Sequence, residues 1–202
     1  MSEDGVILVG VDGSPESLGA VDWAVARAAR DDWRVHVLCA YSLPSFTTAS
    51  LDGGYAALDD TAVRSGAQAV VDEAVARAQD KDVAVTSSLE TGDPAGVLVD
   101  LSGEAALAVV GTRGGGGFAD RLLGTVSSAL PAHAYCPTIV VPRHTEGAEY
   151  TPVGRIVVGV DGSDSARKAL RWAVREAEVW GAELTAIAAV PMASGAGALA
   201  WL

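Results

Sequence analysis

The sequence predicts an α/β protein built on an open parallel sheet of five strands with helices on both faces, followed by a partial β-α-β repeat. Short apolar runs rich in Val and Ile alternate with amphipathic stretches of helical period. Short connections join them, and this alternation is typical of parallel sheets with right-handed crossovers. A glycine-rich segment follows the fourth apolar run, where such sheets bind their ligands.

The first strand and helix are expected within the first 31 residues. Residues 6–11 are apolar, mostly β-branched and bounded by Gly13, as in a strand buried on both faces. Ser14 can cap the helix that follows, and Pro15 suits its first turn. The pair Asp31-Asp32 ends this helix and is expected to be solvated. Five of its residues recur at helical spacing: Ala20, Trp23, Ala24, Arg27 and Ala28.

The second strand is expected at residues 34–40 and the third near residues 83–89. Residues 42–58 between them are rich in Ser, Thr and Gly and predict a long loop, of the kind that serves as a lid or lacks order. Residues 59–79 predict an amphipathic helix whose inward positions are Ala67, Val70, Val71, Ala74 and Ala78.

The remaining elements of the sheet follow residue 92. Gly92-Asp93-Pro94 starts a short helix that ends near Leu101, and residues 105–110 form another continuously apolar strand. Residues 125–133 predict a helix, and residues 138–141 predict the fifth strand.

An internal repeat starts at Ile156 and matches the segment that starts at Ile7, with a constant offset across strand, helix and second strand. Asp161 corresponds to Asp12 in this repeat. We therefore divide the chain into a nucleotide-binding domain at residues 1–142, a linker at 143–154 and a truncated second repeat at 155–202. The second copy has no counterpart of residues 105–141, so exposed strand edges and apolar faces are expected there.

Composition excludes several classes of partner. The formal net charge is −12 and no Lys/Arg cluster is dense enough to follow a phosphate backbone, which argues against nucleic acid and against membrane surfaces. The acidic N-terminal segment does not resemble a signal peptide, so we expect a cytoplasmic protein. Cys39 and Cys136 lie in apolar, strand-like surroundings and are expected to be buried, inert thiols.

The segment after the fourth strand has the spacing G-x2-G-x9-G-T, formed by Gly111, Gly114, Gly124 and Thr125. Glycines let backbone amides approach oxyanions closely, and the start of the next helix adds unsatisfied amides and a positive dipole end. Arg113 adds charge to this site or is simply solvated, and both interpretations stay open. Hydroxyl donors to phosphate are expected from Thr125, Ser127 and Ser128. The competing interpretation is a flexible glycine turn before an ordinary helix.

The position of Asp12 links it to this glycine segment. If the strand order is 3-2-1-4-5, Asp12 and Gly111 end the two strands that flank the switch point, where an acidic acceptor and a phosphate site meet. Asp12 then accepts from a ribose hydroxyl or the base, or merely turns the chain. The backbone near Ala40 and Tyr41 borders the same crevice and reads the adenine edge.

With these motifs the chain resembles the universal stress protein family, in its ATP-binding branch. The resemblance rests on VGVDGS, on GDP at residues 92–94, on VVGTRGGGGFADRLLGTVSSAL and on CPTIVVP. It implies the 3-2-1-4-5 order of an adenine nucleotide alpha hydrolase-like sheet and a Mg or Mn ion that bridges the phosphates. It also implies a homodimer through the fifth strand. The residues that it implies for ATP are Asp12, Ala40, Val110, Gly111, Gly114, Gly124, Thr125 and Val126.

The sequence therefore favours a regulatory, ATP-binding protein of the stress response that is not primarily an enzyme. A slow ATPase or nucleotidyl-transfer enzyme is the first alternative, although no well-placed general base is evident. The second alternative is an interaction module with an empty crevice, whose half-repeat forms the contact surface.

Overall fold

The computed structural model describes residues 5–42, 60–79, 81–114, 123–143 and 150–189. The chain divides into two compact units, residues 1–149 and 150–202, and this division falls inside the predicted linker. The loop predicted at residues 42–58 lies, apart from Ser42, outside the described residues.

The first unit contains one sheet of five parallel strands in the order β3-β2-β1-β4-β5, which confirms the predicted topology. β1 is the central strand, and its apolar residues pair directly with those of its neighbour β4, with Ile7 opposite Leu107 and Val9 opposite Val109. The strands are β1 (Val6–Gly10), β2 (Arg34–Tyr41), β3 (Val85–Thr91), β4 (Leu107–Gly111) and β5 (Thr138–Val141).

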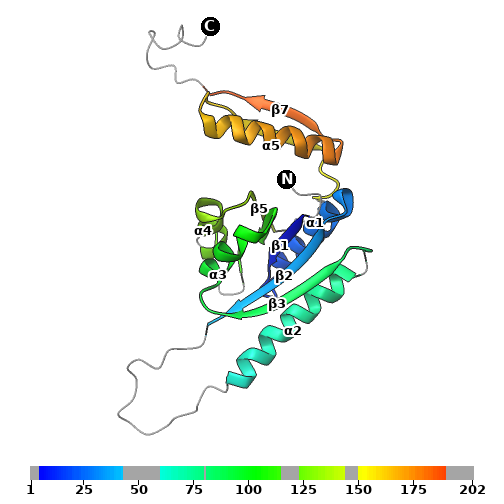
Figure 1. Cartoon of the computed structure of the whole chain (residues 1–202), viewed down its shortest axis with the longest axis vertical. Coiled ribbons are helices and arrows are strands. Elements are labelled where there is room, and N and C mark those ends of the chain that lie inside the picture. Colours follow the sequence, from blue (N-terminus) through cyan, green and yellow to red (C-terminus); the bar gives the residue numbers. More distant parts are fainter. Residues whose placement is uncertain (1–4, 43–59, 80, 115–122, 144–149, 190–202) are drawn as a thin grey trace, which may run out of the picture. The chain divides into compact units, whose positions relative to one another are not determined.

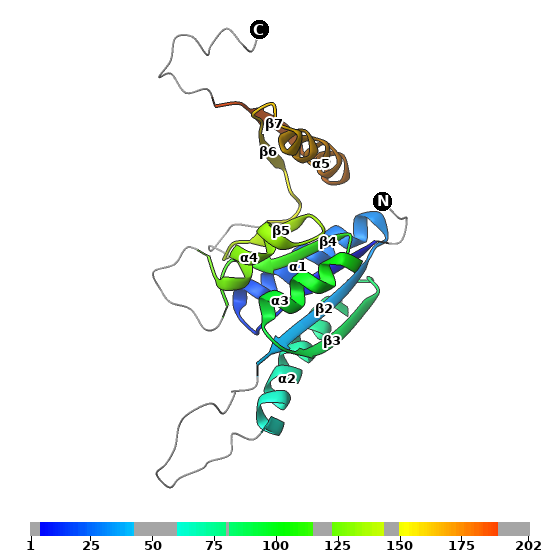
Figure 2. The same cartoon turned by 60° about the vertical axis from the view of Figure 1, so that its left-hand side comes forward.

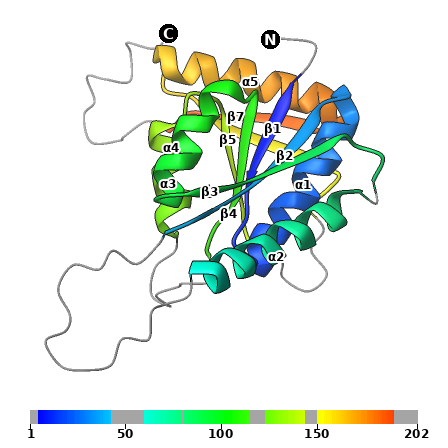
Figure 3. The same ribbon diagram turned by 60° about the horizontal axis from the view of Figure 1, so that its bottom comes forward.

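Helices cover both faces of this sheet (Figure 1). Two of them, α1 (Pro15–Asp31) and α2 (Asp60–Gln79), pack beside each other on one face (Figure 3). The other two, α3 (Pro94–Leu101) and α4 (Thr125–His133), lie on the opposite face (Figure 2). This division follows from the topology, because the chain moves from β1 to β3 in one direction and returns to β4 and β5 in the other.

Side-chain caps start two of these helices where the sequence predicts them. The Ser14 Oγ atom accepts a hydrogen bond from the Ser17 amide at 3.2 Å, and Pro15 opens α1. Asp93 does the same for α3, since its Oδ2 atom accepts from the Gly96 amide at 2.9 Å. Both caps directly follow the end of a strand, so they fix where the chain leaves the sheet.

The core has two apolar layers, one on each face of the sheet. Ile7 and Val9 of β1 are fully buried on the side of α1 and α2, together with Trp23 of α1, which packs in the core as expected. The second layer lies under α3 and α4 and consists of Leu8, Leu38, Leu98, Ala108, Val110 and Leu130. This second layer continues into the base of the cavity described below.

Three details differ from the sequence prediction. β3 begins at Val85 instead of residue 83. β4 begins at Leu107 instead of residue 105, and a 3-10 turn (Ser102–Glu104) lies between α3 and β4. Asp31 is not simply solvated, since its Oδ2 atom accepts from both terminal nitrogens of the fully buried Arg27 at 3.0 Å. A buried guanidinium needs such a partner, and the Trp33 ring stacks against it 4.8 Å away.

The second unit has the predicted β-α-β arrangement: β6 (Arg155–Gly159), α5 (Asp164–Trp180) and β7 (Glu183–Ile187). Several positions that are buried in the first copy are open here. Val157 is 56% exposed, whereas its counterpart Leu8 is 3% exposed, because nothing equivalent to α3 or β4 covers this face within the unit. Among the described helices of both units, none is both long and apolar enough to cross a bilayer.

Candidate functional site

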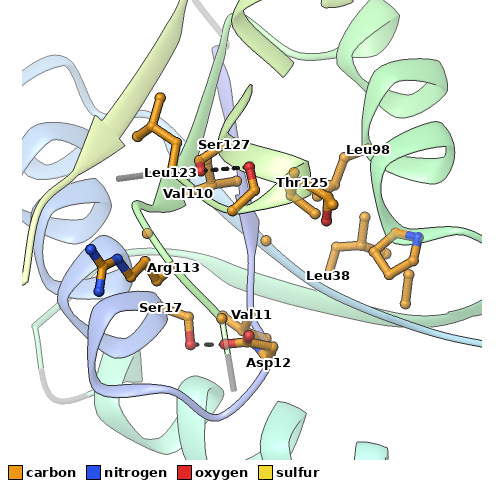
Figure 4. A pocket seen from close by; sticks show the side chains of 17 residues that line it. Val11, Asp12, Ser17, Leu38, Leu98, Val110, Arg113, Leu123, Thr125 and Ser127 are labelled. Carbon is orange, nitrogen blue, oxygen red and sulfur yellow. Dashed lines mark hydrogen bonds between the residues drawn. The ribbon is translucent and has the colours of Figure 1, made fainter. Parts of the chain in front are cut away.

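A cavity of about 350 Å³ opens at the carboxyl ends of the central strands, between the start of α1 and the start of α4 (Figure 4). This is the edge at which open parallel sheets bind ligands. All ten residues predicted from the sequence line it: Asp12, Ala40, Val110, Gly111, Arg113, Gly114, Gly124, Thr125, Val126 and Ser127. The structure therefore brings the glycine segment and Asp12 together.

The Asp12 carboxylate is held by the turn that starts α1. Its Oδ1 atom accepts from the Ser14 amide at 3.0 Å and from the Ser14 hydroxyl at 2.6 Å. The Asp12 amide in turn donates to the Ser17 Oγ atom at 3.3 Å (Figure 4). These bonds orient the other carboxylate oxygen, Oδ2, toward the glycine segment. The sequence prediction missed this role of Ser14, although a serine two residues after an aspartate often signals such a turn.

Two glycines of the motif are required by close contacts within the protein. A Cβ atom on Gly114 would overlap the Oδ2 atom of Asp12. A Cβ atom on Gly111 would lie 2.7 Å from the Glu16 carbonyl carbon and 2.8 Å from its oxygen, where the backbone has no room to yield. Gly111 and Gly114 therefore allow the end of β4 to lie directly against the first turn of α1.

Gly124 differs from these two glycines, because neither packing nor backbone conformation requires it. It has φ −77°, and the nearest atom to an added Cβ would be the Thr112 carbonyl oxygen at 3.6 Å. It is the N-cap of α4 and offers no side-chain acceptor, whereas Ser14, Asp93 and Ser163 cap the other α-helices whose caps are described. The first amides of α4 thus face the cavity without a side-chain cap, an arrangement that favours an anion.

The serine hydroxyl groups near the start of α4 donate to backbone carbonyl oxygens. Ser127 donates to the Thr112 carbonyl oxygen at 2.7 Å, and Ser128 donates to the Gly124 carbonyl oxygen at 2.8 Å. Both hydroxyl groups thus have backbone partners, and their expected donation to a phosphate stays a prediction. Thr125 is exposed at the cavity and is the remaining hydroxyl of the three.

The opposite wall of the cavity is apolar. Leu38, Leu98 and Val110 are each less than 5% exposed and line this wall (Figure 4). Pro94 also lines the cavity. The sequence prediction missed Leu98 and Pro94, because only the fold brings the start of α3 to this edge. Such a wall suits a flat heteroaromatic ring.

The charged and reactive groups near the cavity are few. Arg113 is exposed, and its guanidinium points away from Leu38 and Leu98 (Figure 4), while its carbonyl oxygen accepts from the Ser14 hydroxyl at 3.3 Å. Burial raises the pKa of the Cys39 thiol, and the charge of Asp12 raises it further, so this thiol stays neutral as expected. Cys136 is only partly buried, unlike the expectation, and this partial burial still raises the pKa of its thiol.

The arrangement can therefore bind a ligand that has an apolar ring, hydrogen-bond donors and an anionic group. The ring fits the wall around Leu98, a donor fits Asp12, and the anion fits the start of α4. Within the described ranges, no group of three or more His, Cys, Asp or Glu side chains is placed to hold a metal ion.

Comparisons with known proteins agree with this architecture. The sequence model of the universal stress protein family matches residues 5–142 and 152–200, which is most of both units. A universal stress protein of Mycobacterium tuberculosis is 34% identical over 191 residues, covering 90% of this chain and 62% of its own length. The chain thus spans about three-fifths of the length of such curated relatives.

Solved structures give the same result. A universal stress protein in complex with cAMP is 27% identical, with a TM-score of 0.54, and the match covers 71% of this chain and all of that one. A universal stress protein from Archaeoglobus fulgidus has the same fold over 97% of this chain and 71% of its own, with a TM-score of 0.72 at 19% identity.

Proposed function

Because the chain belongs to the universal stress protein family, we propose that it binds an adenine nucleotide, preferentially ATP, in the cavity beside Asp12. Occupancy of this cavity would act as a regulatory signal in the stress response. The observation that carries the proposal is the meeting of three groups in one cavity: an apolar wall, an oriented carboxylate and uncapped helix amides. The relative that holds cAMP supports an adenine nucleotide as the ligand class.

The nucleoside half of the ligand fits the side of the cavity between β1, β2 and α3. The adenine ring would lie against Leu38 and Leu98, with its edge at the backbone of Ala40. A ribose hydroxyl would donate to the Asp12 carboxylate, which two hydrogen bonds from Ser14 hold in place. A charged acceptor held in advance binds a neutral donor strongly, since less ordering is needed on binding.

The phosphate half fits the start of α4. The amides of Thr125 and Val126 begin the helix without a capping side chain, and its dipole favours negative charge there. The open space at Gly124 would let a phosphate oxygen approach these amides closely. The preference for ATP comes from the resemblance of the G-x2-G-x9-G-T spacing to the ATP-binding branch of the family.

A Mg or Mn ion fits this site only as a partner of the phosphates. Asp12 and Thr125 are the described lining residues with a carboxylate or an available hydroxyl that suit such an ion. Mg²⁺ commonly keeps several waters and binds through one carboxylate and phosphate oxygens. The ion would offset the charge of a triphosphate, because Arg113 is the one described cationic residue that lines the cavity.

The lining argues against catalysis as the main activity. Among the described lining residues, Asp12 is the one possible general base, and its Oδ1 atom is engaged by Ser14. General-base catalysis needs a group within hydrogen-bond reach of the attacking water and with a suitable pKa. We therefore propose a binding protein, with slow ATP hydrolysis as the alternative.

Assembly and location complete the proposal. β5 pairs with β4 alone among the described strands and leaves an edge at which a second copy could add its own β5. We propose a homodimer through this edge. Analytical sedimentation that showed only monomer at micromolar concentration would contradict this proposal. The two cysteines are free, which agrees with a reducing, cytoplasmic setting.

The nucleotide that accompanies the purified protein tests the proposed function. Freshly purified protein would be denatured, and the released small molecules identified by mass spectrometry. An adenine nucleotide in near-stoichiometric amount is expected. The proposal would be refuted if no adenine nucleotide co-purified and none bound when it was added. Turnover of ATP with and without Mg²⁺ distinguishes a binding protein from a slow ATPase, because sustained metal-dependent hydrolysis is expected only for the latter.

A further inference from the structure

Two hydrogen bonds converge on the Thr112 carbonyl oxygen, at the point where the chain leaves β4. The Gly124 amide donates to it at 2.9 Å, and the Ser127 hydroxyl donates to it at 2.7 Å. The Thr112 amide itself donates to the Val141 carbonyl oxygen at 2.9 Å. The first turn of α4 is thereby tied to the end of β4 and, through it, to β5.

Ser127 is 2% exposed, so its hydroxyl cannot replace the hydrogen bond to the Thr112 carbonyl oxygen with one to bulk water. The Ser127 Oγ atom also lies 3.2 Å from the Gly124 carbonyl oxygen, which is a second, more distant acceptor for the hydroxyl. Ser128 on the next position donates to the Gly124 carbonyl from an exposed site and makes no bond to Thr112. The two adjacent serines therefore have different hydrogen-bond partners.

We propose that Ser127 is a positioning residue for the phosphate group of the ligand. Its hydroxyl holds the start of α4 against Thr112, and this contact directs the amides of Thr125 and Val126 into the cavity. The inference rests on the proposed function, because it assumes that an adenine nucleotide binds there. The hydroxyl itself does not donate to the phosphate, since its proton is already given to Thr112.

Removal of the Ser127 hydroxyl leaves the Thr112 carbonyl with one donor and loosens the start of α4. The Ser127→Ala variant is expected to bind AMP about three- to tenfold more weakly, the usual effect of one buried hydrogen bond. Adenosine has no phosphate, and its contacts with the apolar wall and Asp12 do not involve α4 amides. Its affinity is therefore expected to change by less than about twofold, which a general loss of structure would not reproduce.

Titration calorimetry of AMP and adenosine against the wild type, Ser127→Ala and Ser128→Ala tests this inference. The expected result is a loss confined to AMP and to Ser127→Ala, with Ser128→Ala close to the wild type. Equal AMP affinity in Ser127→Ala and the wild type, or an equal loss for AMP and adenosine, would overturn the positioning role alone. A wild type that binds neither AMP nor ATP would overturn the proposed function and this inference with it. If Ser127→Ala does not fold, Ser127→Cys, whose thiol is slightly larger and a weaker donor, allows the same comparison.

Discussion

Replacing Gly124 by Asp is expected to change stability and ligand binding in opposite directions. Gly124 has the extended backbone of an N-cap, with φ −77° and ψ 175°, and α4 has no side-chain cap. Aspartate is among the preferred N-cap residues, and its charge favours the positive end of the helix. Because an added Cβ meets nothing closer than 3.6 Å, the new side chain fits without strain. We expect a gain of about 0.5–1 kcal/mol in the free energy of unfolding, or roughly 1–4 °C in Tm.

The same carboxylate would occupy the place proposed for phosphate. Two unit charges about 4 Å apart repel by about 4 kcal/mol at an effective dielectric constant of 20, which corresponds to an affinity loss of roughly 1000-fold. Thermal unfolding and calorimetric titration with AMP measure the two effects on the same preparation. Gly124→Asn is the matched control, because it caps the helix without the charge and should bind AMP at least tenfold more tightly than Gly124→Asp. Wild-type affinity in Gly124→Asp would refute the assignment of the phosphate site, and lower stability would refute the capping argument.

Two further changes test how the site is held, and a third tests the pH dependence of the stability of the sheet. Gly111→Ala should lower the free energy of unfolding by about 1–3 kcal/mol in urea titrations, because its Cβ would press on the Glu16 backbone. Ser14→Ala should lower it by about 1 kcal/mol and also weaken AMP binding, since the cap of α1 and the support of Asp12 are lost together. Burial lowers the pKa of His36 below its usual 6.5. The stability that neutral His36 contributes is therefore complete above pH 6.5 and is lost as the pH falls through the lowered pKa. His36→Gln should therefore reduce the loss of stability that urea unfolding records between about pH 7 and pH 5.

Much of the first unit is predictable because its local signals agree with one another. The β-branched run before Gly13, the cap at Ser14 and the apolar period of α1 all indicate the same strand, turn and helix. The start of β4 is less predictable, because Ala105 and Ala106 continue the apolar run of the strand although the strand begins only at Leu107. Boundaries of this kind depend on tertiary packing, which has no local pattern.

The site illustrates a different limit of sequence reasoning. The spacing of the glycines predicts which residues share the cavity, but it does not distinguish Gly114, which contacts Asp12, from Gly124, which contacts nothing closely. Residue type alone suggests that Ser127 presents a donor to the ligand, whereas its proton is used by the Thr112 carbonyl 15 residues earlier. The periodicity likewise predicts Arg27 only as one position on the repeating face of a helix, and the structure reveals its ion pair with Asp31. Hydrogen-bond partners across a loop are set by the fold.

Backbone amide shifts on titration with AMP test the central claim most directly. In ¹⁵N-labelled protein, the amides of Gly111, Gly114, Gly124, Thr125 and Val126 should shift most, because the phosphate and ribose are proposed to lie among them. The amides of the second unit should shift least, since the proposed site consists wholly of first-unit residues. Saturable binding whose largest shifts lie in the second unit, or at β5, would contradict the proposed nucleotide site.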